Sequence, residues 1–403
     1  MNRTPVKTNI FLLIFIFSFA VFLAHTLFTK TAVFSDGRFY YAITRSLVKD
    51  KDIKFRNEFT ALNVTPTTTH QDYVWNMYPP GAPLFWMPLF IITDGFIYLT
   101  KLLSTPWGWF TLDTLGYGIV FQTAVAMSSI FLGTLGLYLI YQLLNDFFSE
   151  KISLFTTIAL FATTNLLFYT AVEPINSHAV SFFIAALFLF YFLKYKTDKY
   201  YFFVLGIIGG VAGIVRTQDL LILIIPTIYV LQNFKFKFKK LSASFLLLTS
   251  GVLIAFLPQI IFWQKIFNTL WYSPYLDVGF NLLKPRIIFV LFNTQNGLFT
   301  ITPFIALAVA GTFLVNKKLI SLRNIALPYF LLQLYLISSW GNYYQGGSYS
   351  IRMMISSYPF VVFGLAEIIN ILIKKISLQK TYTVIFLFIL LNNILIIRYL
   401  LLY

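Results

Sequence analysis

Long apolar runs, separated by short polar or basic stretches, fill most of the chain. A transmembrane helix needs about 20 mainly apolar residues, because it must cross about 30 Å of hydrocarbon. On this criterion the runs predict about eleven transmembrane helices, over residues 10–28, 113–144, 152–170, 178–193, 201–215, 220–232, 241–263, 298–315, 324–339, 353–373 and 382–402. The first run is longer than the apolar part of a cleavable signal and lacks a small-residue cleavage site, so it predicts a retained span.

Basic residues cluster in alternate loops between these runs. The clusters are Lys194, Lys196 and Lys199; Lys235, Lys237, Lys239 and Lys240; Lys317, Lys318 and Arg323; and Lys374, Lys375 and Lys380. Cytoplasmic loops of membrane proteins carry an excess of lysine and arginine. The alternation therefore predicts a multi-pass protein of the cell membrane with a cytoplasmic N-terminus.

Residues 29–112 are predicted to form a long first extracytoplasmic loop with two interfacial helices. Within residues 38–50 the apolar positions recur at helical spacing, which is typical of an amphipathic helix on a membrane surface. A second interfacial helix is expected to begin at Tyr78, since its prolines and Asp94 make it a poor full span. Without a separate soluble domain, residues 1–403 are expected to form a single all-α transmembrane domain.

The composition agrees with this pattern and excludes a soluble globular protein. The 403 residues are 58% hydrophobic and 11% charged, with a mean hydropathy of +0.77. A soluble domain carries roughly 25% charged residues. The absence of cysteine excludes disulfides and thiolate chemistry. The net charge of +16 lies in scattered loop clusters rather than on one continuous face, so no nucleic-acid partner is expected.

Ionisable residues at the predicted outer ends of the helices are candidates for a functional site. Charged groups at membrane depth usually face a polar cavity, and the candidates are Asp36, Glu173, His178, Arg216 and Arg352. Four of them also have a structural interpretation: Asp36 is a favourable helix N-cap, His178 is a satisfied helix-end histidine, and the two arginines extend to lipid headgroups. The glycine-rich aromatic stretch before Arg352 favours phosphate binding there. The sequence contains no Cys/His metal-binding spacing.

Six short motifs follow one another along the chain. They are Ser35-Asp36-Gly37, Tyr78-Pro79-Pro80-Gly81, Ser177-His178, Val215-Arg216-Thr217-Gln218, Asn296-Gly297-Leu298-Phe299 and residues 346–352. Together, and in this order, they resemble the GT-C superfamily of membrane glycosyltransferases that use a polyprenyl-phosphate sugar donor. More narrowly, the sequence is similar to bacterial relatives of the protein O-mannosyltransferase and lipid A aminoarabinose transferase group.

The resemblance implies a sugar donor carried on undecaprenyl or dolichyl phosphate, and a glycan, lipid or protein acceptor. It implies that Asp36 is the catalytic base, that Arg352 contacts the lipid phosphate and that Glu173 assists. The other expected substrate-binding residues are Arg216, His178 and Tyr78. No cofactor is firmly implied. Gly37 stands where many relatives carry a second acidic residue, so dependence on a divalent cation stays open.

The residue types also predict a mechanism. One carboxylate without a nucleophilic partner favours a single displacement with inversion at the sugar, assisted by a general base. Trp75, Trp340, Tyr343 and Tyr344 are expected either to stack on sugars or to anchor the protein at the interface. A lipid or solute transporter, a surface-polysaccharide polymerase or ligase, and a non-catalytic scaffold stay open as alternatives. Transporter sites lie near the membrane midplane, whereas the polar residues here concentrate at one face.

Overall fold

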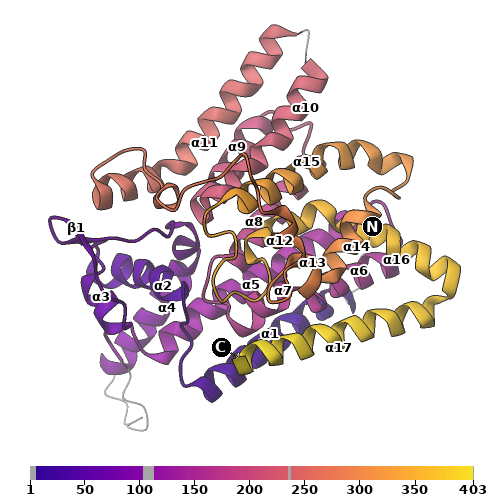
Figure 1. The fold of residues 1–403 in the computed structure, drawn as a ribbon. Helices are drawn as coiled ribbons and strands as arrows, with labels where there is room; N and C mark the ends of the chain where they lie inside the picture. The colour runs from indigo at the N-terminus through magenta and orange to yellow at the C-terminus, as the bar shows by residue number, and fades with distance from the viewer. Residues whose placement is uncertain (1–5, 103–112, 235–236, 403) are drawn as a thin grey trace.

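The computed structural model describes residues 6–102, 113–234 and 237–402, which form a bundle of helices with one small hairpin (Figure 1). The long helices are α1 (Val6–Thr29), α4 (Gly81–Leu102), α5 (Ile119–Leu144), α11 (Phe238–Phe267), α15 (Lys317–Ser339), α16 (Tyr358–Ile376) and α17 (Leu378–Leu402). The shorter helices are α2 (Gly37–Arg45), α3 (Arg56–Ala61), α6 (Glu150–Ala162), α7 (Asn165–Leu167), α8 (His178–Lys194), α9 (Tyr201–Val215), α10 (Ile224–Phe234), α12 (Ile287–Phe292), α13 (Leu298–Ile301) and α14 (Pro303–Gly311). The hairpin is β1 (Thr68–His70) and β2 (Tyr73–Val74), and the single π or 3₁₀ turns are η1 (Ser46–Asp50), η2 (Phe168–Val172), η3 (Thr217–Leu223), η4 (Pro274–Leu276) and η5 (Arg352–Ser357).

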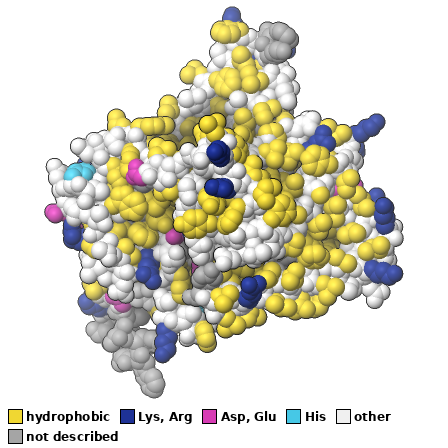
Figure 2. Space-filling view, in the orientation of Figure 1, with side chains coloured by type: hydrophobic (Ala, Val, Ile, Leu, Met, Phe, Trp, Pro, Cys, Tyr) yellow, Lys and Arg dark blue, Asp and Glu magenta, His cyan; other side chains and the backbone are white. Residues whose placement is uncertain are grey.

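The helices confirm a multi-pass membrane protein. Among the described residues, 8 helices are long and apolar enough to cross a membrane, or 9 if the bent pair of α6 with α7 and η2 is one span. Figure 2 shows apolar side chains over much of the face in view, as expected for a surface in contact with lipid. Helices α8 and α9 are apolar but shorter than these candidate spans.

The described helices do not confirm the predicted number of about eleven spans, for local reasons. The segment predicted as one span over residues 298–315 is two short helices, α13 and α14, which meet at Thr302. Pro303 starts α14, and proline has no N–H with which to continue the preceding helix. Helix α4 differs in the other direction. It is one continuous helix of 22 residues that is long and apolar enough to span, whereas an interfacial helix was expected.

Several helices break at the same end of the bundle. The α6 axis bends by 69° into α7 and η2, and 3₁₀ turns η3 and η5 precede α10 and α16. At the first break the Thr164 hydroxyl donates to the carbonyl of Leu160 at 2.7 Å and accepts from the amide of Leu166 at 3.2 Å. Side-chain hydrogen bonds of this kind replace the helical ladder and allow a kink. The breaks turn backbone and side chains toward a common interior region.

Glycines allow two helix pairs to approach backbone to backbone. A Cβ on Gly206 of α9 would lie 2.1 Å from the carbonyl oxygen of Leu248 in α11, and a Cβ on Gly364 of α16 would lie 2.1 Å from that of Ala308 in α14. Small residues at crossings are how membrane helices gain close packing without a hydrophobic driving force between them. These crossings fix α9 against α11 and α14 against α16.

The first long loop folds into a small unit with its own apolar core. Ile43, Phe55, Phe59 and Val74 pack together there, and Phe262 from the end of α11 completes the cluster. The helix expected over residues 38–50 is present as α2 and η1. It is buried over more of its surface than an interfacial helix would be, because it contacts both this core and α4.

A buried ion pair holds the same unit together. Arg45, which is 5% exposed, donates to Glu58 at 2.6 Å and also pairs with Asp50. Glu58 is fully buried, so removal of Arg45 would leave its carboxyl group in the unit without the cation that pairs with it. The pair therefore fixes α2, and with it the residues that precede α2, against α3.

The backbone contact at Gly364 yields a stability prediction. We expect Gly364→Ala to lower the melting temperature of the detergent-solubilised protein, because overpacking a close contact costs about 1–3 kcal/mol. Gly95→Ala in α4 is the matched control, since a Cβ there meets nothing within 4 Å and alanine favours a helix. Equal melting temperatures for Gly364→Ala and the wild type would contradict the proposed helix contact.

Candidate active site

Two residues far apart in the sequence form an ion pair at the broken end of the bundle. The Nη2 atom of Arg352, the first residue of η5, lies 2.6 Å from the Oδ2 atom of Asp36, which directly precedes α2. Their side chains are 17% and 23% exposed. Gly37 permits this position, because a Cβ there would lie 2.3 Å from the carbonyl oxygen of Ile175. A second acidic residue at position 37 would therefore displace Asp36.

The structure does not match the structural interpretations of these residues as a helix cap and as headgroup anchors. Asp36 occupies the N-cap position of α2, but its side chain makes no capping hydrogen bond. Arg352 and Arg216 point into the protein rather than out to headgroups, and Arg216 is 9% exposed. The carboxylate of Asp36 is thus directed at a cation instead of at its own helix.

A polar cavity of about 550 Å³ surrounds the ion pair. Four of the residues predicted from the sequence line it with Asp36, namely Arg352, Glu173, Arg216 and Tyr78. Residues from α1, from the end of α17 and from the loop between α15 and η5 complete the wall, among them His25, Tyr399, Trp340, Asn342 and Gln345. Gly81 allows the start of α4 to approach the backbone of α9 closely, because a Cβ there would lie 2.4 Å from the carbonyl oxygen of Ile214.

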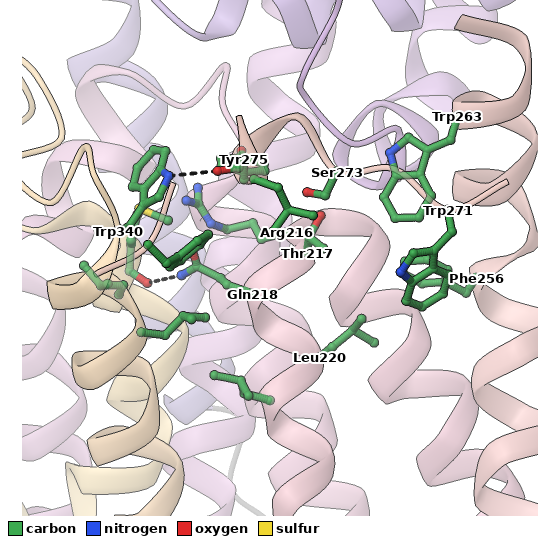
Figure 3. A pocket seen from close by; sticks show the side chains of 16 residues that line it. Arg216, Thr217, Gln218, Leu220, Phe256, Trp263, Trp271, Ser273, Tyr275 and Trp340 are labelled. Carbon is green, nitrogen blue, oxygen red and sulfur yellow. Dashed lines mark hydrogen bonds between the residues drawn. The ribbon is translucent and has the colours of Figure 1, made fainter. Parts of the chain in front are cut away.

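An apolar cavity of about 390 Å³ adjoins the polar one (Figure 3). Figure 3 shows Arg216 between Tyr275 and Trp340, with Trp263, Trp271 and Phe256 on the opposite side. The residues that line both cavities are Arg216, Tyr275, Trp340 and Met353. A charged, polar compartment thus opens beside an aromatic and aliphatic one, with Arg216 at their boundary.

Arg216 is held by Ser177 and His178 at the start of α8. Its Nη1 atom donates to the hydroxyl of Ser177 at 3.0 Å and lies 3.1 Å from Nδ1 of His178. The hydroxyl of Tyr40 in α2 also donates to Ser177 at 3.0 Å. His178 is 2% exposed and is not among the residues that line the two cavities described above. We predicted His178 to bind substrate, whereas the structure places it behind Arg216.

A buried carboxylate that we did not select from the sequence connects the breaks around the cavity. Asp219 in η3 accepts from Ser181 of α8 at 2.6 Å, from Ser356 of η5 at 2.8 Å and from Gln333 of α15 at 3.1 Å. It is 2% exposed. Three side-chain hydrogen bonds offset the desolvation of a buried carboxylate. Asp219 therefore fixes the turns that carry Arg216 and Arg352.

The remaining motifs have structural partners near the site. Asn296, in the motif before α13, donates to the carbonyl of Tyr344 at 2.6 Å and so anchors the glycine-rich loop. Trp340 lines both cavities, whereas Tyr344 is 50% exposed and Tyr343 packs on Phe289. Four aromatic residues were expected either to stack on sugars or to anchor the protein at the interface. Of these, Trp340 lines the two described cavities, and Trp75 lies elsewhere in the first loop.

The cavity alters the ionisation of groups that border it. Burial raises the pKa of the Glu173 carboxyl to about 7; the Asp36 carboxylate acts in the same direction, and Arg352 opposes both. Burial and the Asp36 carboxylate raise the pKa of the Tyr78 hydroxyl well above its usual range. Among the described residues, no group of three His, Cys, Asp or Glu side chains is placed to hold a metal ion.

Comparison with known proteins assigns the fold. The chain shares its fold with a solved ArnT structure. It is similar to the crystal structure of ArnT from Cupriavidus metallidurans bound to undecaprenyl phosphate, with a TM-score of 0.54 and 13% identity, over 94% of this chain and 62% of that chain. The chain thus spans less than two thirds of the length of that ArnT chain. No family model matches the sequence, and no curated protein matches it.

The raised pKa of Glu173 can be measured directly. We expect a carboxyl infrared band that is present below pH 7 and lost as the pH rises through about 7, because burial favours the neutral acid. Burial raises the pKa of Glu58 to about 7 as well, so spectra of Glu173→Gln and of Glu58→Gln must each be subtracted from the wild type. A Glu173 difference band that titrates near its ordinary value of 4.5 would contradict this environment.

Proposed function

We propose that the protein is a membrane glycosyltransferase that moves a sugar from a polyprenyl-phosphate carrier to an acceptor hydroxyl at the outer face of the membrane. The observation that carries the proposal is the Asp36–Arg352 ion pair in the wall of a polar cavity that adjoins an apolar one. A donor with a sugar, a phosphate and a long hydrocarbon tail needs a polar cavity, a cation and an apolar cavity side by side. The similar ArnT structure is bound to undecaprenyl phosphate, which supports a donor of this kind.

Two arginines are available for the phosphate. Arg352 and Arg216 both line the polar cavity, and Arg216 also lines the apolar one. Guanidinium groups suit phosphates because their planar fork donates two hydrogen bonds at once. A phosphate between the two arginines places the attached tail beside Trp263, Trp271 and Phe256 in the apolar cavity (Figure 3).

The ion pair gives the reaction an order of events. In the protein without donor, the Asp36 carboxylate is bound to Arg352. An incoming phosphate competes for Arg352 and so releases Asp36 toward the acceptor hydroxyl. The acceptor oxygen then bonds to the anomeric carbon while the carbon–oxygen bond to phosphate breaks. The proton passes to Asp36, and the arginines stabilise the departing phosphate. This single displacement inverts the configuration at the sugar.

Helix direction supports an outward-facing site. Helix α15 begins at Lys317 and Lys318, and its last residue precedes Trp340 in the cavity wall. Its 23 residues at 1.5 Å each separate these ends by about 35 Å, close to the thickness of a hydrocarbon core. Helix α16 runs from the site toward lysines in its last turn, and α8 runs from His178 to Lys194. The basic ends therefore correspond to the cytoplasm.

A transfer assay tests the proposal. Purified protein in nanodiscs would be given radiolabelled polyprenyl-phosphate sugars, with membrane extract as the acceptor source. We expect release of polyprenyl phosphate that falls about 10²–10⁴-fold in Asp36→Asn, the usual contribution of a general base. The matched control is Asp94→Asn, which removes a 2.7 Å ion pair with Lys49 outside the polar cavity and should leave the rate unchanged.

Two results would contradict the proposal. Full transfer by a folded Asp36→Asn protein would exclude Asp36 as the base. Lack of turnover with every donor, together with movement of a lipid or solute across the bilayer, would favour a transporter.

Binding measurements separate the roles of the two partners. Undecaprenyl phosphate should bind Asp36→Asn at least as tightly as the wild type, because the variant no longer competes for Arg352. It should bind Arg352→Ala about 10–100-fold more weakly, since hydrogen bonds to charged groups contribute about 1.5–3 kcal/mol. Weaker binding by Asp36→Asn than by the wild type would contradict competition for one arginine.

The apolar cavity predicts a dependence on tail length. Leu336 lines this cavity and not the polar one, so Leu336→Trp should fill space that the tail occupies. We expect a higher KM for undecaprenyl donors and an unchanged KM for donors with a tail of one or two isoprene units. An equal effect on both donors would place the tail elsewhere.

A further inference from the structure

A short turn in the wall of the polar cavity carries two amide side chains. Asn342 and Gln345 both line the cavity. The backbone N–H of Gln345 donates to the backbone carbonyl of Asn342 at 3.0 Å. Gln345 and Gly346 have φ angles of +56° and +62°, the left-handed geometry that closes such a turn. Trp340 precedes the turn and lines the same cavity.

Each amide presents a buried polar atom without a partner. Nε2 of Gln345 and Oδ1 of Asn342 have no hydrogen-bond partner in the described part of the chain. Gln345 is 4% exposed, and its Oε1 accepts from the backbone N–H of Met353 at 3.3 Å. That bond fixes the amide orientation and leaves Nε2 as a free donor. A buried unpaired group costs about 1–3 kcal/mol, so two on one turn indicate that a ligand supplies the partners.

The chemistry of the turn matches a sugar better than a phosphate or a tail. It offers one donor and one acceptor, both uncharged, beside an indole ring. A hydroxyl can accept from the first and donate to the second, whereas a phosphate accepts only and a hydrocarbon does neither. The indole provides an apolar face for the C–H side of a sugar ring. Residues 340–350 contain no Asp or Glu, so the turn has no anion to pair with the ammonium group of an amino sugar.

We propose that Asn342 and Gln345 bind the sugar of the donor and select an uncharged, hydroxylated sugar over an amino sugar. This inference rests on the proposed function and adds the substrate class. Solvent does not reach the two atoms, so the sugar meets them after a small rotation of the turn. Gly346 and Gly347 next to it are exposed, and a Cβ on Gly346 would meet nothing within 4 Å, which leaves space for that movement.

The test compares binding of two lipids that differ by the sugar alone. Undecaprenyl phosphate and undecaprenyl-phosphate glucose or mannose would be titrated into nanodiscs with the wild type and with Asn342→Leu, which removes the acceptor and keeps the size. We expect Asn342→Leu to bind the sugar-bearing lipid about 10-fold more weakly, the loss of one buried hydrogen bond, with unchanged affinity for undecaprenyl phosphate. The second readout confirms that the variant is folded and its phosphate site intact.

A second variant tests selectivity. Gln345→Glu keeps an oxygen for the Met353 N–H and replaces the free donor by a carboxylate oxygen. We expect its relative affinity to shift from the glucose or mannose lipid toward an undecaprenyl-phosphate amino sugar.

Equal affinities of Asn342→Leu and the wild type for the sugar-bearing lipid would overturn the inference, as would a wild type that prefers the amino sugar. Failure of the proposed function is distinguishable, because it shows as absence of transfer while these binding differences are still measured.

Discussion

The Asp36–Arg352 ion pair is the constraint on which the rest of the site depends. A charge at the edge of an apolar bundle is costly unless it is paired and hydrogen-bonded, so the fold must bring together the start of α2 and the start of η5. Gly37 and Gly81 remove side chains where these segments meet the backbone near Ile175 and Ile214. Asp219 fixes the turn that carries Arg352 through Ser356. Glycines and buried polar groups that look unrelated in the sequence thus serve one geometry.

The same physics explains why the polar residues gather where helices break. A lipid-facing helix satisfies its own backbone, whereas a broken helix exposes polar groups that need partners or a water-filled cavity. The turns η2 and η5 contribute residues to the wall of the polar cavity, and η3 begins directly after Arg216, which also lines it. Some of the freed groups are satisfied internally, as Gln218 shows by donating to the carbonyl of Met353 at 2.9 Å. Others, such as Nε2 of Gln345, have no partner in the described part of the chain.

Much of the fold follows from apolar runs and charge clusters, and the chain is similar in fold to ArnT. The helix break at Pro303 could be predicted from the sequence, because proline in a predicted span signals an interruption. The motifs also placed Asp36, Glu173, Arg216 and Arg352 around one cavity, although their roles stay predictions. The position of His178 behind Arg216 and the unpaired amides could not be predicted, because they depend on side-chain directions in irregular loops rather than on spacing along a helix.

The most direct test is a cryo-electron-microscopy structure of the wild-type protein with undecaprenyl phosphate. We expect the phosphate within hydrogen-bond distance of Arg352, the tail along Trp263 and Trp271, and the Asp36 carboxylate released from Arg352. A phosphate bound at another place, with the Asp36–Arg352 pair intact, would contradict the claim that base and phosphate share one arginine.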